Sequence, residues 1–153
     1  MKLLAIETAT EACSVALWID GEVRERFGIV PRQHAELTLP WAEQLLTEAG
    51  IAKSQLDAIA VGRGPGAFTG VRLAVALAQG IALALDRPVV PVSTLAALAF
   101  AAPLAGEGAR RAGGGANILA AIDARMGEIY VAAFRREGDA VMVTSHEIVI
   151  PPA

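Results

Sequence analysis

Residues 71–85 place the strongest constraint on the fold, because they read as one helix with apolar or small side chains on every side. A helix that covers one face of a sheet needs only a single apolar stripe. Two interpretations remain: the helix is enclosed within its own domain, or it packs on a sheet on one side and on a second subunit on the other. We favour the second. Along its fourfold columns stand Leu73, Leu77, Ile81 and Leu85; Ala74, Ala78 and Ala82; Ala76, Gly80 and Ala84; and Val71 and Val75 with Gln79.

The composition indicates a soluble chain with an apolar surface. Of the 153 residues, 54% are hydrophobic, and the mean hydropathy is +0.49. One small domain has a limited interior, so we expect part of this surface to contact a partner. The net charge of −3 argues against a basic face for nucleic acid.

Several features favour a cytoplasmic location without a membrane segment. The single cysteine, Cys13, predicts a small buried residue in a reducing compartment. The apolar run at residues 3–6 is too short for a signal sequence. Arg72 and Gln79 interrupt the stretch at 71–85, which we therefore expect to fall short of a membrane span.

The order of predicted elements is that of an α/β protein. Three strands come first, and Asp20-Gly21 predicts a tight hairpin between the second and the third. Strands and helices then alternate. Ser93 is the expected cap of the last helix. The expected strands lie at 2–8, 13–20, 22–29, 57–61, 88–92, 118–122, 128–134 and 140–150, and the helices at 34–49, 71–85 and 93–102.

An antiparallel trio followed by strand–helix crossovers is typical of one half of a ribonuclease H-like fold. We expect a complete half of this kind at 1–103 and a flexible Gly-, Ala- and Arg-rich loop at 104–116. Residues 117–153 then read as the start of a second, similar subdomain, without its helices.

A glycine-rich loop connects the strand at 57–61 to the long helix. Its spacing formally matches a dinucleotide-binding fingerprint, but Pro65 removes an amide donor and Gly66 to Gly70 delay the helix. It also lacks the Gly-Lys-Ser/Thr ending of a Walker A loop. A tight strand-to-helix connection is the better interpretation of Gly62-Arg63-Gly64-Pro65-Gly66-Ala67-Phe68-Thr69-Gly70.

The first turn, residues 7–10, is a weak candidate for a phosphate site. The hydroxyls of Thr8 and Thr10, with neighbouring backbone amides, could hold a phosphate. An ordinary threonine-rich hairpin explains the same residues equally well.

Other polar residues offer little chemistry. His34 and His146 stand far apart without further ligands at metal spacing, so we expect solvent-facing or capping roles. Asp123, Arg125 and Glu128 flank a tight turn and form either a local ion-pair cluster or a contact surface. We find no persuasive nucleophile with a base and expect neither a catalytic residue nor a metal site.

Three segments together resemble the bacterial TsaB (YeaZ) family, and the similarity runs along nearly the whole chain. This family is related to TsaD (Kae1/YgjD, formerly called glycoprotease), and both have the actin-like ATPase fold. The segments are Leu4-Ala-Ile-Glu-Thr-Ala-Thr-Glu-Ala-Cys-Ser-Val-Ala-Leu17, Gly62 to Arg72, and Ile122-Asp-Ala-Arg-Met-Gly-Glu128.

The resemblance implies a subunit without activity of its own. The metal-binding histidine pair of TsaD corresponds here to Thr94 and Leu98, which cannot serve as iron or zinc ligands. The phosphate turn of TsaD corresponds to residues 123–125, and Glu7 replaces the usual aspartate of the first turn. These changes imply that no cofactor is bound.

The resemblance also implies partners. The family pairs with a TsaD-type catalytic subunit through helices of its N-terminal half, and a TsaE-type ATPase joins them to modify the tRNA adenosine beside the anticodon. The chain itself would contact tRNA only indirectly and would form a homodimer in isolation. The implied interface residues are Leu37, Trp41, Leu45, Arg72, Leu73, Ala76, Leu77, Gly80, Ile81 and Ala84, and the family-motif residues are Arg63, Gly64, Pro65, Gly66, Thr69, Gly70, Asp123, Arg125 and Glu128.

Two alternatives remain. An ATP-binding phosphotransferase of the same fold would turn over ATP without a partner. A metalloprotease, as the older family label suggests, would need ligands that the sequence lacks.

Overall fold

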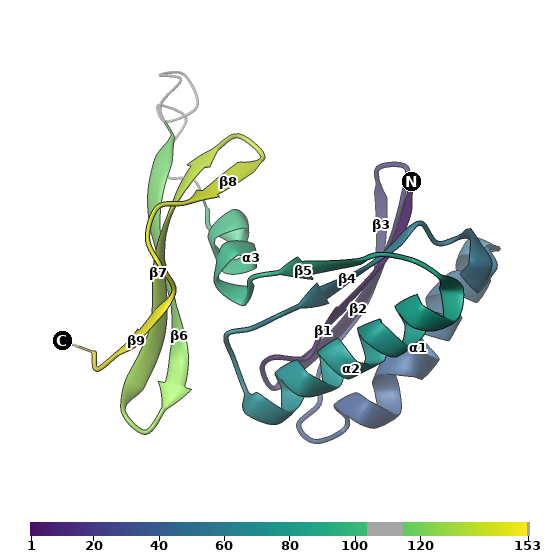
Figure 1. Cartoon of the computed structure of the whole chain (residues 1–153), viewed down its shortest axis with the longest axis horizontal. Helices are drawn as coiled ribbons and strands as arrows, with labels where there is room; N and C mark the ends of the chain where they lie inside the picture. Colours follow the sequence, from purple (N-terminus) through teal and green to yellow (C-terminus); the bar gives the residue numbers. More distant parts are fainter. Residues whose placement is uncertain (104–114, 153) are drawn as a thin grey trace. The chain divides into compact units, whose positions relative to one another are not determined.

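The computed structural model describes residues 1–103 and 115–152 of the chain. The chain divides into two compact units, Met1–Val92 and Ser93–Ala153 (Figure 1). Most of the loop predicted at 104–116 lies outside the described residues.

A five-stranded mixed sheet forms the centre of the first unit. Its strands lie in the order β3-β2-β1-β4-β5. The first three strands along the chain pair antiparallel, whereas β4 pairs parallel with both β1 and β5. The elements are β1 (Lys2–Glu7), β2 (Ala12–Ile19), β3 (Glu22–Ile29), α1 (His34–Ala49), a short 3-10 turn (Lys53–Gln55), β4 (Ala58–Gly62), α2 (Phe68–Leu85) and β5 (Val89–Val92).

Turn chemistry sets the register of β2 and β3. Asp20 and Gly21 have φ of 49° and 102°, the positive values that a two-residue type I′ hairpin needs. This confirms the predicted hairpin and pairs Ile19 with Glu22. Alternate residues of β2 then face the helices and are buried, namely Cys13, Val15 and Leu17.

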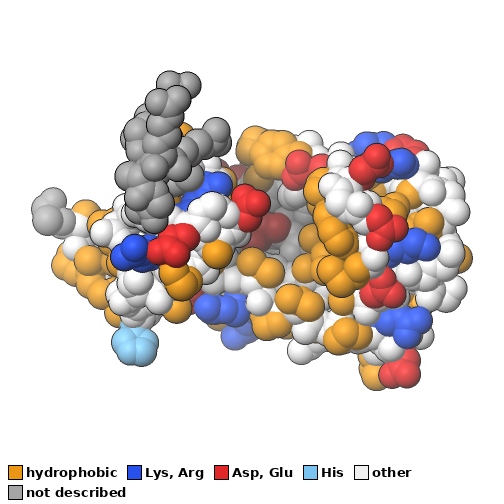
Figure 2. Space-filling view, turned by 90° about the horizontal axis from the view of Figure 1, so that it is seen from above, with side chains coloured by type: hydrophobic (Ala, Val, Ile, Leu, Met, Phe, Trp, Pro, Cys, Tyr) orange, Lys and Arg blue, Asp and Glu red, His pale blue; other side chains and the backbone are white. Residues whose placement is uncertain are grey.

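Helices α1 and α2 cover the same face of this sheet (Figure 1). Helix α2 packs through three buried alanines, whose small side chains let the helix backbone approach the strands closely. The opposite face of the sheet carries exposed apolar side chains, and Figure 2 shows apolar side chains gathered on this unit. The alanines are Ala74, Ala78 and Ala82, and the exposed residues are Val23, Phe27, Ile29, Val90 and Val92.

Helix α2 is longer than predicted, because it begins at Phe68 and not at Val71. By length and composition alone it could cross a membrane. The expectation that this stretch falls short of a membrane span is therefore wrong on that criterion. Its alanine stripe packs on the sheet of its own unit.

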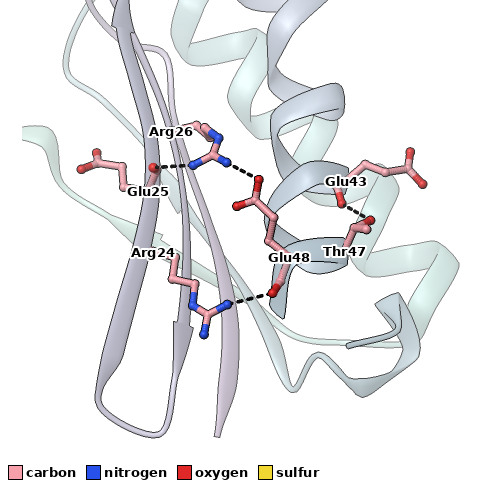
Figure 3. Close-up of polar contacts among 6 residues, drawn as sticks. All are labelled: Arg24, Glu25, Arg26, Glu43, Thr47 and Glu48. Carbon is pink, nitrogen blue, oxygen red and sulfur yellow. Dashed lines mark hydrogen bonds and ion pairs between the residues drawn. The ribbon is translucent and has the colours of Figure 1, made fainter. Parts of the chain in front are cut away.

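Polar contacts tie the edge strand β3 to the end of α1 (Figure 3). The Arg24 guanidinium donates to the carbonyl of Glu48 at 3.1 Å, and Arg26 forms an ion pair with the Glu48 carboxylate. Carbonyls in the last turn of a helix lack intrahelical donors, so the Arg24 bond also satisfies a helix end. Charged side chains on an edge strand discourage pairing with another chain.

The second unit is an antiparallel sheet with one helix packed on it. Strand β7 pairs with β6 on one side and with both β8 and β9 on the other. The strand predicted at 140–150 is divided in two, because the Thr144 and Ser145 amides both donate to the Ala133 carbonyl. The elements are α3 (Thr94–Ala101), β6 (Ala116–Arg125), β7 (Glu128–Glu137), β8 (Ala140–Val143) and β9 (Ile148–Ile150).

Helix α3 belongs to this second unit. Ser93 caps it as predicted, because its Oγ accepts a hydrogen bond from the Ala96 amide at 3.1 Å. Leu95 and Ala99 pack with residues of β6 and β7. The compact units therefore divide before α3, whereas the predicted subdomain 1–103 places this helix with the first sheet.

The predicted fold class is confirmed. The first unit has the strand and helix order of a ribonuclease H-like half, and in the second unit another antiparallel hairpin follows α3. This α/β arrangement is that of the actin-like ATPase fold.

Two substitutions in α1 should separate its core contacts from its surface contacts. Leu45 is fully buried, so Leu45→Ala should lower the free energy of unfolding by about 2–5 kcal/mol. The Arg26–Glu48 pair is partly exposed and screened by solvent, so Glu48→Gln should cost less than about 1 kcal/mol. Urea unfolding followed by circular dichroism measures both values, and equal losses would contradict this assignment.

Candidate partner-binding site

The glycine-rich loop packs its backbone against the first turn of the same unit. The Ala67 amide donates to the Ala9 carbonyl at 2.7 Å, and Thr8 Oγ1 donates to the Gly70 carbonyl at 2.7 Å. A Cβ on Gly70 would lie 1.9 Å from the Thr8 carbonyl oxygen. Close packing of two backbones therefore explains the glycine at this position without any ligand.

The remaining motif residues of this loop range from the buried Gly64 to the half-buried Pro65 and Gly66. Gly64 has φ of +85°, a value that favours glycine, and the Gly64–Pro65 peptide bond is cis. Arg63 and Thr69 are exposed. The loop fixes where α2 begins, and it orients the first turn of that helix.

The candidate phosphate residues are engaged by their own chain. Thr8 is buried and its hydroxyl donates to Gly70, as described above. The Thr10 hydroxyl accepts from the Ala12 amide at 3.1 Å, and the Glu7 carboxylate accepts from the Ala9 amide at 2.6 Å. These bonds are those of a threonine-rich hairpin, the alternative interpretation of the turn.

Helix α2 presents an apolar face that its own unit leaves uncovered. Leu83 is 85% exposed and Phe68 is 69% exposed. A Cβ on Gly80 would meet no atom within 4 Å, so the space above it is open. Of the predicted interface residues, Arg72, Ala76, Gly80 and Ala84 are exposed, whereas Leu73, Leu77 and Ile81 are half-buried.

The prediction missed Leu83 and Phe68 on this helix. Leu83 follows Ala76 and Gly80 at a spacing of four and three, which is the helical signal that could have found it. Phe68 was missed because the helix was expected to start at Val71. We define the α2 face as the exposed residues Phe68, Arg72, Ala76, Gly80, Leu83 and Ala84.

Helix α1 contributes less to the surface than predicted. Leu45 lies in the hydrophobic core with no exposed area, so its assignment to an interface is wrong. Trp41 is half-buried, and its ring lies against the Gly28 backbone of β3, where a Cβ would come within 3.3 Å of it. Leu37 is half-buried. The large apolar side chain that this helix exposes is Leu39, which the prediction did not name.

The third family segment forms the β6–β7 hairpin of the second unit. The Asp123 carboxylate accepts from the Arg125 backbone amide at 2.7 Å, and Arg125 and Met126 have φ of 67° and 55°. Within residues 1–103 and 115–152, no ion pair joins Asp123, Arg125 and Glu128, so the local ion-pair cluster is not formed. All three are exposed.

Other reactive groups lie apart. His34 is the first residue of α1, directly after the N-cap Gln33, and it is half-buried. Its Nε2 is buried without a hydrogen-bond partner, so the predicted solvent-facing or capping role is wrong for this histidine. His146 is exposed as expected. Among the described residues no group of three His, Cys, Asp or Glu side chains could hold a metal ion.

Cys13 is buried in the core as predicted. Burial raises the pKa of its thiol, and a hydrogen bond with Thr38 lowers that pKa by less. The two atoms, Sγ and Oγ1, are 3.5 Å apart. A raised pKa leaves little thiolate at neutral pH, which is typical of a structural cysteine.

The fold and the site define a class: a ribonuclease H-like chain with an uncovered apolar helix face. Residues 18–153 match the family model described as TsaD, tRNA N6-adenosine threonylcarbamoyltransferase. The structure of YeaZ from Pseudomonas aeruginosa superposes with a TM-score of 0.86 at 48% identity, covering 99% of this chain and 68% of that one.

Two curated relatives agree with this match. The tRNA threonylcarbamoyladenosine biosynthesis protein TsaB of Escherichia coli is 48% identical over 92% of this chain and 58% of its own length. The protein of the same name from Haemophilus influenzae is 44% identical over 90% of this chain and 55% of its own length. The chain belongs to the TsaB (YeaZ) family, and it spans a little over half the length of these relatives.

A matched pair of glycine substitutions in α2 tests the packing of the loop. Gly70→Ala should lower the free energy of unfolding by about 2 kcal/mol or more, because its Cβ would overlap the Thr8 carbonyl. Gly80→Ala should raise it by up to about 1 kcal/mol, because the site is open and alanine favours a helix. Chemical denaturation measures both, and a Gly70→Ala protein as stable as the unchanged chain would contradict the contact.

The Cys13 thiol should resist modification in the folded protein. A thiol-reactive disulfide reagent at pH 7 should label it only as fast as the chain opens, because the thiol is buried and its raised pKa disfavours the thiolate. Labelling in urea is the control and should be complete. Complete labelling of the folded protein within minutes would show that the thiol is accessible.

Proposed function

We propose that this chain is a non-catalytic subunit in the biosynthesis of threonylcarbamoyladenosine on tRNA. It binds a TsaD-type catalytic subunit through the α2 face. The observation that carries the proposal is the exposure of Leu83 beside the open site at Gly80, together with that of Phe68 in the first turn of the same helix. Family membership supports the choice of pathway, because the relatives are named for that biosynthesis.

The physical case for a partner rests on the chemistry of α2. The alanine stripe and the partly buried side chains beside it already pack α2 on its own unit, so the exposed Leu83 and Phe68 add little to the fold of this unit. Large exposed apolar side chains beside small ones fit the pattern of an interface, where anchor residues insert into a partner and small residues allow close approach.

The polar groups of the first turn support a role without chemistry of its own. The hydroxyls of Thr8 and Thr10 and the carboxylate of Glu7 all take part in hydrogen bonds within the chain. The Thr8 hydroxyl could donate to a phosphate only if it gave up its bond to the Gly70 carbonyl. In the proposed assembly the catalytic groups come from the TsaD-type subunit, and this chain binds no cofactor.

The proposed assembly includes further partners. A TsaE-type ATPase joins the pair, tRNA is contacted only through the catalytic subunit, and the assembly acts in the cytoplasm. In isolation the chain pairs with a second copy through the same α2 face, so the two kinds of dimer compete for one surface.

Substitutions on the α2 face test the proposal. With the cognate TsaD-type subunit, Leu83→Glu and Gly80→Arg should each weaken binding by about tenfold or more, because they place a charge or bulk in an apolar contact. Isothermal titration calorimetry measures the dissociation constants. Both positions are open to solvent, so circular dichroism should show an unchanged fold.

The matched control is Val23→Glu. Val23 is 66% exposed, and it lies in the edge strand β3 on the face of the sheet that the helices do not cover. It should leave the dissociation constant unchanged. Binding that survives both α2 substitutions, or that is lost equally in the control, would contradict the assigned surface.

A further inference from the structure

Arg72 is the one charged residue in α2, and it lies on the α2 face. Its guanidinium carbon lies 3.6 Å from the centroid of the Phe68 ring. Stacking of this kind holds the cation over the ring and limits its rotamers. The first turn of α2 therefore presents a positive charge in a defined position.

Nothing in the described part of the chain neutralises this charge. No carboxylate forms an ion pair with Arg72 there, and its guanidinium makes no hydrogen bond with a described residue. Arg26 and Arg136 differ in this respect: Arg26 pairs with Glu48, and Arg136 donates to carbonyls of its own unit. The five N–H donors of Arg72 remain available to a partner.

From this position we infer that Arg72 is the specificity-determining charge of the α2 face. The surface of the catalytic subunit that covers α2 carries a carboxylate opposite Arg72. This inference rests on the proposed function and adds to it the chemistry of the partner. A guanidinium buried at an interface without a counter-charge would be strongly unfavourable, so a partner that covers Phe68 and Arg72 must supply one.

The pairing also explains how an apolar helix selects one partner. The apolar contacts of Ala76, Gly80 and Leu83 select partners weakly, because many apolar surfaces can pack against these side chains. A carboxylate that meets a planar, stacked guanidinium is directional and forms two parallel hydrogen bonds. A competing apolar surface without an acid would leave the charge unpaired and would bind less tightly.

Three single substitutions test the inference with the purified cognate TsaD-type subunit. Arg72→Gln should weaken binding by about 10- to 100-fold, the range expected when a charged hydrogen-bonded partner is lost. The affinity of Arg72→Lys should lie between those of Arg72→Gln and the unchanged chain, because lysine keeps the charge but loses the forked geometry. Arg32→Gln removes an exposed arginine outside α2 and is the charge-matched control, expected to bind as the unchanged chain does.

Salt dependence supplies a readout that a merely structural role would not change. The dissociation constant of the unchanged complex should rise more steeply between low and high NaCl than that of Arg72→Gln, because the pair is screened. Identical slopes together with unchanged affinity would overturn the inference.

The outcomes separate this inference from the proposed function. If Leu83→Glu abolishes binding while Arg72→Gln does not, the partner surface stands and the charge assignment is wrong. If no complex forms with the unchanged chain, both are wrong. If Arg72→Gln weakens only self-association in sedimentation, the carboxylate belongs to a second copy and the assignment to the catalytic subunit is overturned.

Discussion

The structure of the first unit depends on the alanine stripe of α2. Ala74, Ala78 and Ala82 fill the space between helix and sheet, where larger side chains would hold the helix away. Val75, Leu77, Ile81 and Leu85 pack beside them and are partly buried, so only the side of the helix that faces away from the sheet stays outside the core. The large side chains Leu83 and Phe68 consequently lie at the surface.

A second close contact fixes the position of α2 along its axis. Gly70 approaches the Thr8 carbonyl so closely that a side chain would not fit, and Ala67 bonds to Ala9. The glycine motif is therefore a packing device that joins two backbones, and the same contact places the Phe68–Arg72 pair at the start of the helix. The exposed face and its charge follow from these two contacts.

Much of this fold could be predicted from the sequence. Asp20-Gly21 gave the hairpin, and the apolar periodicity of residues 34–49 gave a helix with the observed ends, because turn chemistry and burial are local signals. The start of α2 was missed, because Ala67 and Gly70 at this end of the helix bond to Ala9 and Thr8, which are distant in the sequence. The break between β8 and β9 likewise depends on bonds to Ala133 across the sheet.

The candidate site was predicted as an element but not residue by residue. A helix apolar on all sides indicates that one side is free, but not which one. Leu45 was placed at an interface because its fourfold spacing with Trp41 does not distinguish a core stripe from a contact stripe. Leu83 was missed because the spacing of apolar residues alone does not show that this side of the helix is exposed. The sheet decides the orientation of each helix, and it is built from strands distant in sequence.

Site-specific cross-linking tests the central claim most directly. A photo-reactive amino acid in place of Leu83, and separately in place of Val23, would be irradiated with the cognate TsaD-type subunit present, and the products separated by mass. Because Leu83 lies on the α2 face and Val23 does not, an adduct between the two chains is expected for the first position alone. An adduct from Val23 with none from Leu83 would show that the partner binds another surface.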